Sequence, residues 1–71
     1  MKNEMIVSRD QDGYLNYQIK GGHYCVGNEQ TVFEEIEDEI EKGRKVFVKG
    51  KSFLPGDRIK LRLLEKGALI K

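Results

Sequence analysis

The segment that most restricts the fold of this chain is residues 31–42, which have the pattern of a short amphipathic helix. Thr31 and Glu34 stand at the spacing of a capping box, in which the two residues satisfy each other's free backbone N–H groups at a helix start. Gly43 follows where a left-handed cap ends a helix. The apolar residues at helical spacing are Val32, Phe33, Ile36 and Ile40. A single helix of about 12 residues, roughly 18 Å long, needs a sheet to cover that side.

The segments before this helix predict strands. Residues 5–9 and 14–20 flank a turn that ends in Asp12-Gly13, and the second segment alternates apolar and polar residues. This arrangement is typical of a β-hairpin. His23–Val26 is rich in residues that favour strands and predicts a third strand.

The segments after the helix predict a second hairpin. Residues 45–49 and 58–64 alternate, and residues 54–57 between them place Pro and Gly where a type II turn requires them. The sequence therefore predicts an α+β fold, with a small antiparallel sheet of four to five strands, one helix packed on one face and the order β-β-(β)-α-β-β. Because 71 residues leave no room for a second core, we expect residues 1–71 to form a single domain.

The cysteine content and the short apolar segments indicate the setting of the chain. The single cysteine, Cys25, cannot form an internal disulfide, which is typical of a reducing compartment. No stretch approaches the roughly 18 apolar residues that cross a bilayer, and the apolar run near the N-terminus is too short for a signal peptide. We therefore expect a cytoplasmic protein without a membrane segment. A chain this small buries only about 60% of its unfolded surface, so a homodimer would add burial that one copy lacks.

The charged residues are sorted along the chain. Residues 1–42 carry four Lys or Arg against ten Asp or Glu, a net charge of −6, whereas residues 43–71 carry nine against two, a net charge of +7. The total of +1 hides this separation. Segregated charge of this kind is typical of surfaces that bind charged partners.

No set of residues in the sequence supports catalysis, a cofactor or a metal ion. His23 and Cys25 are the only His and Cys residues, whereas even a catalytic zinc site uses three protein ligands. Side chains two residues apart on a strand are about 7 Å apart at their roots, which is too far for a Cys–His nucleophilic pair. The glycine residues lack the spacing of phosphate-binding loops. We therefore predict a protein that is not an enzyme.

The predicted second hairpin places one aromatic residue among cations. If its inner face meets the helix, the opposite face carries Lys45, Phe47, Lys49, Arg58, Lys60 and Arg62. Cations that neutralise phosphates, around a ring that offers a stacking surface, are the composition of a nucleic-acid interface. The alternative is a solvated sheet face, and the low total charge of the chain favours it because dedicated nucleic-acid binders are net basic.

Two further features favour a protein partner. The first is an acidic ridge on the predicted helix, which consists of Glu34, Glu35, Glu37, Asp38 and Glu41. Such a ridge suits a basic partner surface or a second copy of the chain, although it is also the ordinary solvated side of an amphipathic helix. The second feature is an apolar patch predicted on the faces opposite the core, which consists of Tyr14, Phe47 and Leu64. Exposed apolar patches mark protein interfaces.

The first half of the chain resembles the HicB-type antitoxins. In that family an Asp-Gly-Tyr hairpin precedes a helix start of the form Gly-x-Thr-x-Glu-Glu. The corresponding residues here are Asp12-Gly13-Tyr14, Gly27, Thr31 and Glu34-Glu35. The chain departs from the family in the spacing of Gly27 and Thr31, which are four residues apart instead of two, and in lacking the small residues of the family's helix. The resemblance implies a β-β-β-α-β arrangement and a protein partner.

The sequence therefore predicts a small non-catalytic interaction protein that binds a macromolecule, most readily another protein. Its size and character are those of regulators and inhibitors encoded by phages and mobile elements. The predicted binding residues are Tyr14, the outer face of the second hairpin and the acidic ridge. The alternative is a nucleic-acid-binding module that uses the basic hairpin face.

Overall fold

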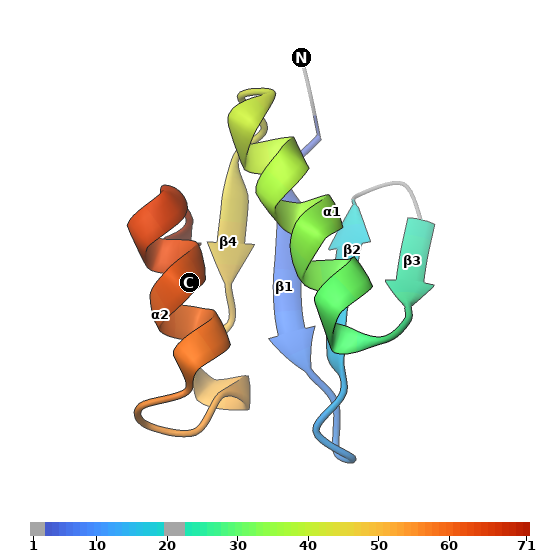
Figure 1. Cartoon of the computed structure of the whole chain (residues 1–71), viewed down its shortest axis with the longest axis vertical. Helices are drawn as coiled ribbons and strands as arrows, with labels where there is room; N and C mark the ends of the chain where they lie inside the picture. Colours follow the sequence, from blue (N-terminus) through green and yellow to red (C-terminus); the bar gives the residue numbers. More distant parts are fainter. Residues whose placement is uncertain (1–2, 20–22) are drawn as a thin grey trace.

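A computed structural model describes residues 3–19 and 23–71 of the chain. Its elements in chain order are β1 (Met5–Arg9), β2 (Leu15–Ile19), β3 (His23–Val26), α1 (Glu29–Glu41), β4 (Val46–Val48), the 3₁₀ turn η1 (Gly50–Ser52), α2 (Arg58–Lys66) and β5 (Leu69–Ile70). The strands form one sheet, and both helices lie against the same face of it (Figure 1). The protein therefore has a small α+β fold with a mixed sheet and two helices.

The strand order in the sheet is β3-β2-β1-β4-β5, so β1 is central. β1 pairs antiparallel with β2, and β2 pairs antiparallel with β3, which confirms the predicted first hairpin and third strand. β1 pairs parallel with β4, and β4 pairs parallel with β5. The prediction of an entirely antiparallel sheet is wrong, because α1 and α2 each act as a crossover that returns the chain in the same direction.

Helix α1 confirms the predicted amphipathic helix but begins earlier. Asn28 is the N-cap, because its side-chain oxygen accepts a hydrogen bond of 2.9 Å from the backbone N–H of Thr31. The predicted capping box at Thr31 therefore lies inside the first turn. Gly43 follows the helix at φ +92°, the left-handed conformation expected at its end. The buried residues of α1 are Val32, Phe33 and Ile36.

Helix α2 replaces the second strand of the predicted C-terminal hairpin, so the prediction of a single helix is wrong. The Asp57 carboxylate caps the helix by accepting a hydrogen bond of 2.9 Å from the backbone N–H of Ile59. Gly67 ends the helix at φ +122°. The alternation over residues 58–64 fits a strand, but Ile59 and Leu63 also stand one helical turn apart. The two caps decide in favour of the helix.

The core lies between the sheet and the two helices. Its buried residues are Met5, Val7, Leu15, Val32, Phe33, Ile36, Val46, Val48, Phe53, Leu63 and Ala68. The two helices also contact each other, so they form a continuous layer over one side of the sheet. Within residues 3–19 and 23–71, neither helix has the length and apolar character needed to cross a membrane.

Candidate functional site

The face of the sheet opposite the helices is not covered by any element of the described ranges (Figure 1). Met5 and Val7 are buried beneath the helices, so Ile6 between them points to the opposite face. The strand register aligns Gln18, Ile6, Phe47 and Leu69 in one row across β2, β1, β4 and β5. We call this row, together with Glu4 and Lys71, the open face.

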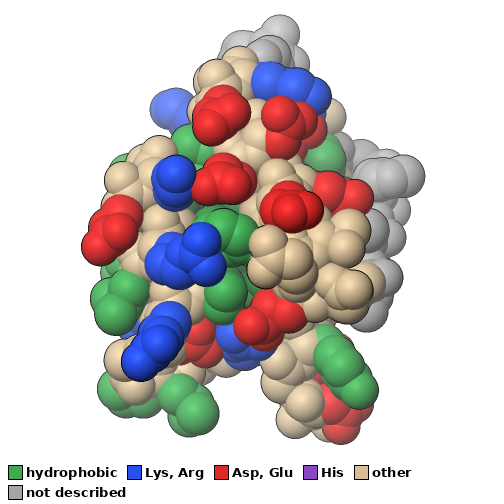
Figure 2. Space-filling view, in the orientation of Figure 1, with side chains coloured by type: hydrophobic (Ala, Val, Ile, Leu, Met, Phe, Trp, Pro, Cys, Tyr) green, Lys and Arg blue, Asp and Glu red, His purple; other side chains and the backbone are tan. Residues whose placement is uncertain are grey.

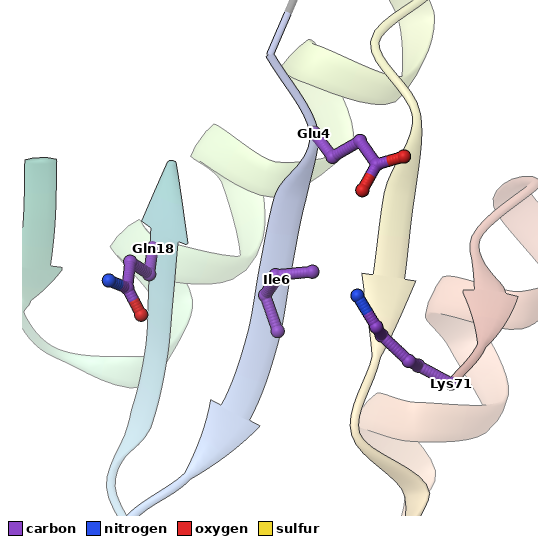
Figure 3. Close-up of a pocket in the computed structure, with 4 residues that line it drawn as sticks. All are labelled: Glu4, Ile6, Gln18 and Lys71. Carbon is purple, nitrogen blue, oxygen red and sulfur yellow. The ribbon is translucent and has the colours of Figure 1, made fainter. Parts of the chain in front are cut away.

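Figure 3 looks onto the open face, with the helices behind the sheet. A hollow of about 310 Å³ lies there, lined by Glu4, Ile6, Gln18 and Lys71. The ammonium nitrogen of Lys71 is 5.3 Å from the centre of the Phe47 ring, within the range of a cation–π contact. Ile6 and Phe47 are half-buried, and Leu69 is 50% exposed. The apolar part of the open face is therefore in contact with solvent.

Each of the parallel strands β1, β4 and β5 places one apolar residue on the open face, and β1 also places Ser8 there. Their apolar runs are Met5-Ile6-Val7, Val46-Phe47-Val48 and Leu69-Ile70. Continuous apolar runs are typical of parallel sheets that are covered on both faces, whereas a sheet with one wet face alternates apolar and polar residues. Here the helices cover one face only. The apolar residues on the other face therefore have no element of the described chain above them.

The structure separates the predicted basic hairpin face into two groups. Phe47 lies on the open face, and Lys45 and Lys49, two residues from it, directly precede and follow β4. The second group lies on α2, on the opposite side of the sheet, and consists of Arg58, Lys60 and Arg62. The guanidinium carbon of Arg62 is 4.3 Å from the centre of the Phe33 ring. A single surface with one aromatic residue among five cations is therefore not formed, because residues 58–66 are helical.

The acidic ridge lies on α1, and part of its charge is compensated within the helix layer. Figure 2 shows acidic side chains over α1 beside basic side chains over α2. Glu37 pairs with Lys66 of α2 at 3.0 Å, and Asp38 pairs with Lys42 at 2.9 Å. The remaining members of the ridge are exposed, namely Glu34, Glu35 and Glu41. The charge separation in the sequence thus becomes two oppositely charged helices that lie side by side in one copy.

Tyr14 lies in the turn before β2 and is exposed. Its backbone N–H donates a hydrogen bond of 2.9 Å to the Asp10 carboxylate, and this bond lowers the pKa of Asp10. Leu64 lies on α2 and packs against the core. The predicted patch of Tyr14, Phe47 and Leu64 is therefore not formed, since Leu64 and Phe47 lie on opposite sides of the sheet.

Arg9, the last residue of β1, joins three parts of the chain that the sequence analysis did not connect. Its guanidinium donates hydrogen bonds to both carboxylate oxygens of Asp57, at 2.8 and 3.3 Å, and to the Glu29 carboxylate and the Gly13 carbonyl, both at 2.8 Å. The side chains of Arg9 and Asp57 are only 15% and 11% exposed. The hydrogen bond between them lowers the pKa of the Asp57 carboxyl and raises the pKa of Arg9.

A second hollow, of about 420 Å³, lies beside this cluster. It is lined by Arg9, Asp10, Gln11, Gly13, Ser52, Leu54 and Asp57. The guanidinium of Arg9 is held by the carboxylates of Asp57 and Glu29 and by the Gly13 carbonyl. We therefore interpret this cluster as structural. No short sequence pattern indicates it, because Arg9 and Asp57 are 48 residues apart.

Among the described residues, no three His, Cys, Asp or Glu side chains gather in a group that could hold a metal ion. The side chains of His23 and Cys25 lie outside the described part of the structure. Compared with models of protein families, with curated proteins and with solved structures, the chain matches none.

Proposed function

We propose that this chain is a small non-catalytic interaction protein that binds another protein through the open face. The observation that carries this proposal is the row of Ile6, Phe47 and Leu69, which lies on the face of the parallel strands that no helix covers. Burying an apolar side chain of the size of Ile, Leu or Phe is worth about 1.5–3 kcal/mol relative to leaving it exposed. A partner that covers the row of Ile6, Phe47 and Leu69 therefore gains affinity from side chains that are already held in place.

The geometry suits a protein interface with an apolar centre and a polar rim. Phe47 lies at the middle of the apolar row, between Ile6 and Leu69, and aromatic residues at such central positions are frequent anchors of binding energy. Glu4 and Lys71 border the row, as the charged rim of an interface does. By covering a surface of its partner, a chain of this kind acts as a regulator or an inhibitor.

The distribution of the cations favours a protein over a nucleic acid as the partner. Lys45 and Lys49 flank the open face, whereas the basic residues of α2 lie on the other side of the sheet next to the acids of α1. A phosphate backbone that followed the basic residues of α2 would lie beside the acidic ridge and be repelled by it.

The proposal is tested with a photoreactive amino acid at one of two matched leucines, in cells that naturally express the chain. Leu69 lies on the open face and is 50% exposed, whereas Leu61 lies on α2 and is 48% exposed. We expect a nuclease-resistant protein adduct from position 69 and none from position 61. Phe47→Ala should reduce the adduct at least about tenfold, as loss of an interface anchor does.

Two results would contradict the proposal. One is an absence of adduct at position 69, and the other is equal adduct at both positions. An adduct that nuclease removes would show that the partner is a nucleic acid and not a protein. Circular dichroism of the Phe47→Ala variant establishes that it retains the fold.

A further inference from the structure

We propose that the protein that covers the open face does so with an acidic segment, whose carboxylates lie over Lys49 and Lys71. This inference rests on the proposed function and deepens it, since it gives the chemistry of the partner at the same surface. Three observations support it, namely the position of the two lysines, the lack of acids beside them in the described part of the chain, and the apolar row next to them.

Lys49 and Lys71 are neighbours on adjacent strands, because the backbone pairing of the sheet continues past the ends of β4 and β5. The N–H of Lys49 donates a hydrogen bond of 2.9 Å to the Val7 carbonyl, and the N–H of Lys71 donates one of 2.9 Å to the Val48 carbonyl. Both lysines therefore continue the alternation of their strands and face the same way as the apolar row. The register of β4 and β5, extended by one residue, places Lys49 beside Lys71, on strands that lie about 4.8 Å apart.

The charge of these two lysines is not balanced locally. Within residues 3–19 and 23–71, no carboxylate lies within ion-pair distance of either ammonium group. Glu4 lies at the other end of the apolar row, beside Lys45 in the register of β1 and β4. Like charges directly opposite each other on neighbouring strands destabilise a sheet. The pair of lysines therefore costs stability that an anion bound over it would recover.

The apolar row makes an acidic protein segment the anion that fits. Phe47 lies two residues before Lys49 on the same face, and the ammonium nitrogen of Lys71 is 5.3 Å from the centre of its ring. Side chains two residues apart on an extended strand are about 7 Å apart. An extended segment that alternates apolar and acidic residues can therefore place an apolar side chain on Phe47 and a carboxylate over the lysines. Glu4 would repel a phosphate backbone that followed the row to its other end.

The inference is tested with charge variants of the full chain that carry the photoreactive amino acid at position 69, in cells that naturally express the chain. Lys49→Glu and Lys71→Glu should each reduce the nuclease-resistant protein adduct about tenfold or more, because they repel the carboxylates of the partner. Lys49→Arg keeps the charge and should retain most of the adduct. Arg58→Glu makes the same change of charge at an exposed residue of α2 and should leave the adduct unchanged.

The stability of the free chain separates a binding role from a structural one. Lys49→Glu places an acid beside Lys71, so the ratio of folded to unfolded chain should rise about twofold or more, as measured by urea denaturation. The variant should therefore bind its partner less well although its fold is more stable. A variant that showed no rise in stability would overturn the inference, because the two lysines would then not be neighbours whose repulsion a partner relieves.

The outcomes also distinguish this inference from the proposed function. Mass spectrometry should place the cross-link at position 69 in a partner segment that contains Asp or Glu within a few residues. A Phe47-dependent protein adduct that is insensitive to both lysines, or that lies in a segment without acids, would overturn the inference and leave the proposed function in place. An equal loss in Arg58→Glu would do the same. An absence of adduct, or an adduct that nuclease removes, would overturn both.

Discussion

The antiparallel half of the sheet (β3 and β2) and its parallel half (β1, β4 and β5), called its two sides below, differ in the pattern of their residues. In the antiparallel half, β2 alternates between residues that face the helices and two polar residues that face away, of which Gln18 is exposed and Asn16 is buried. On the parallel side, β4 is apolar at each of its three positions, and β1 shares this property from Met5 to Val7. In one copy of the chain, both helices lie on the same face of the sheet.

In the proposal made above, this difference reflects a partner that covers the parallel half of the sheet. Alternation of apolar and polar residues, as in β2, is typical of a sheet with one face in water. A continuous apolar strand such as β4 is typical of a sheet that is covered on both faces. On the uncovered face, β2 therefore presents a polar residue, Gln18, whereas the parallel strands present Ile6, Phe47 and Leu69.

The largest effect is expected where α2 covers the parallel side. Leu63 is fully buried beneath α2, and Leu63→Ala should lower the free energy of unfolding by about 3 kcal/mol, through lost burial and the cavity that remains. Chemical denaturation measures this change. The matched variant Leu61→Ala should cost less than about 1 kcal/mol, because Leu61 is 48% exposed on the same helix. Equal costs at both positions would favour the hairpin predicted from alternation over the helix.

A smaller effect is expected at the end of β1, the strand that both sides of the sheet share. Arg9→Met keeps a long apolar stem but leaves the carboxylates of Asp57 and Glu29 without their cation. We expect a loss of about 2 kcal/mol in the free energy of unfolding, because Asp57 is largely buried and cannot be rehydrated without opening the cluster. A loss of less than about 1 kcal/mol, which is typical of an exposed ion pair, would contradict the interpretation of this cluster as structural.

The hydrogen bond between Arg9 and Asp57 also predicts how the stability of the fold depends on pH. The hydrogen bond from Arg9 holds the pKa of Asp57 below its ordinary value of 3.8. The stabilisation is therefore complete above pH 3.8 and is lost as the pH falls through the lower pKa of the folded state. Asp57→Asn can still cap α2 but cannot titrate, so its melting temperature should fall less steeply in acid than that of the wild type. Asp12→Asn, which changes an exposed turn residue, provides the control.

The sequence was sufficient for the elements whose signals are local. The first hairpin and α1 follow from alternation, helical spacing and turn residues within short segments. The C-terminal hairpin failed because the alternation over residues 58–64 fits a strand and a helix alike, and the N-cap at Asp57 was taken for the end of a turn. Of the candidate site, Phe47 was placed correctly on an outward sheet face.

The rest of the site depends on pairings that no local pattern shows. β1 and β4 are about 40 residues apart in sequence, and only their register brings Ile6 beside Phe47. Leu69 lies in β5, and a strand of two residues has no periodicity that a sequence pattern could show. One signal was present, however, since the apolar runs at residues 5–7 and 46–48 are typical of parallel strands.

The smallest effect on stability is expected from replacing an apolar residue of the open face by a polar one, or the reverse, where β1 and β2 meet. Ile6 and Gln18 are direct neighbours across β1 and β2 on the open face. Ile6→Gln should change the free energy of unfolding of the chain by less than about 1 kcal/mol, because it alters a half-buried strand position, yet it should weaken binding of the partner. Gln18→Ile extends the apolar row onto β2 and should strengthen binding. Cross-linking at position 69 and denaturation of both variants separate the two quantities. If Ile6→Gln instead destabilised the chain as strongly as Leu63→Ala, the open face would belong to the core of the single chain, and the difference between the two sides of the sheet would no longer indicate a binding surface.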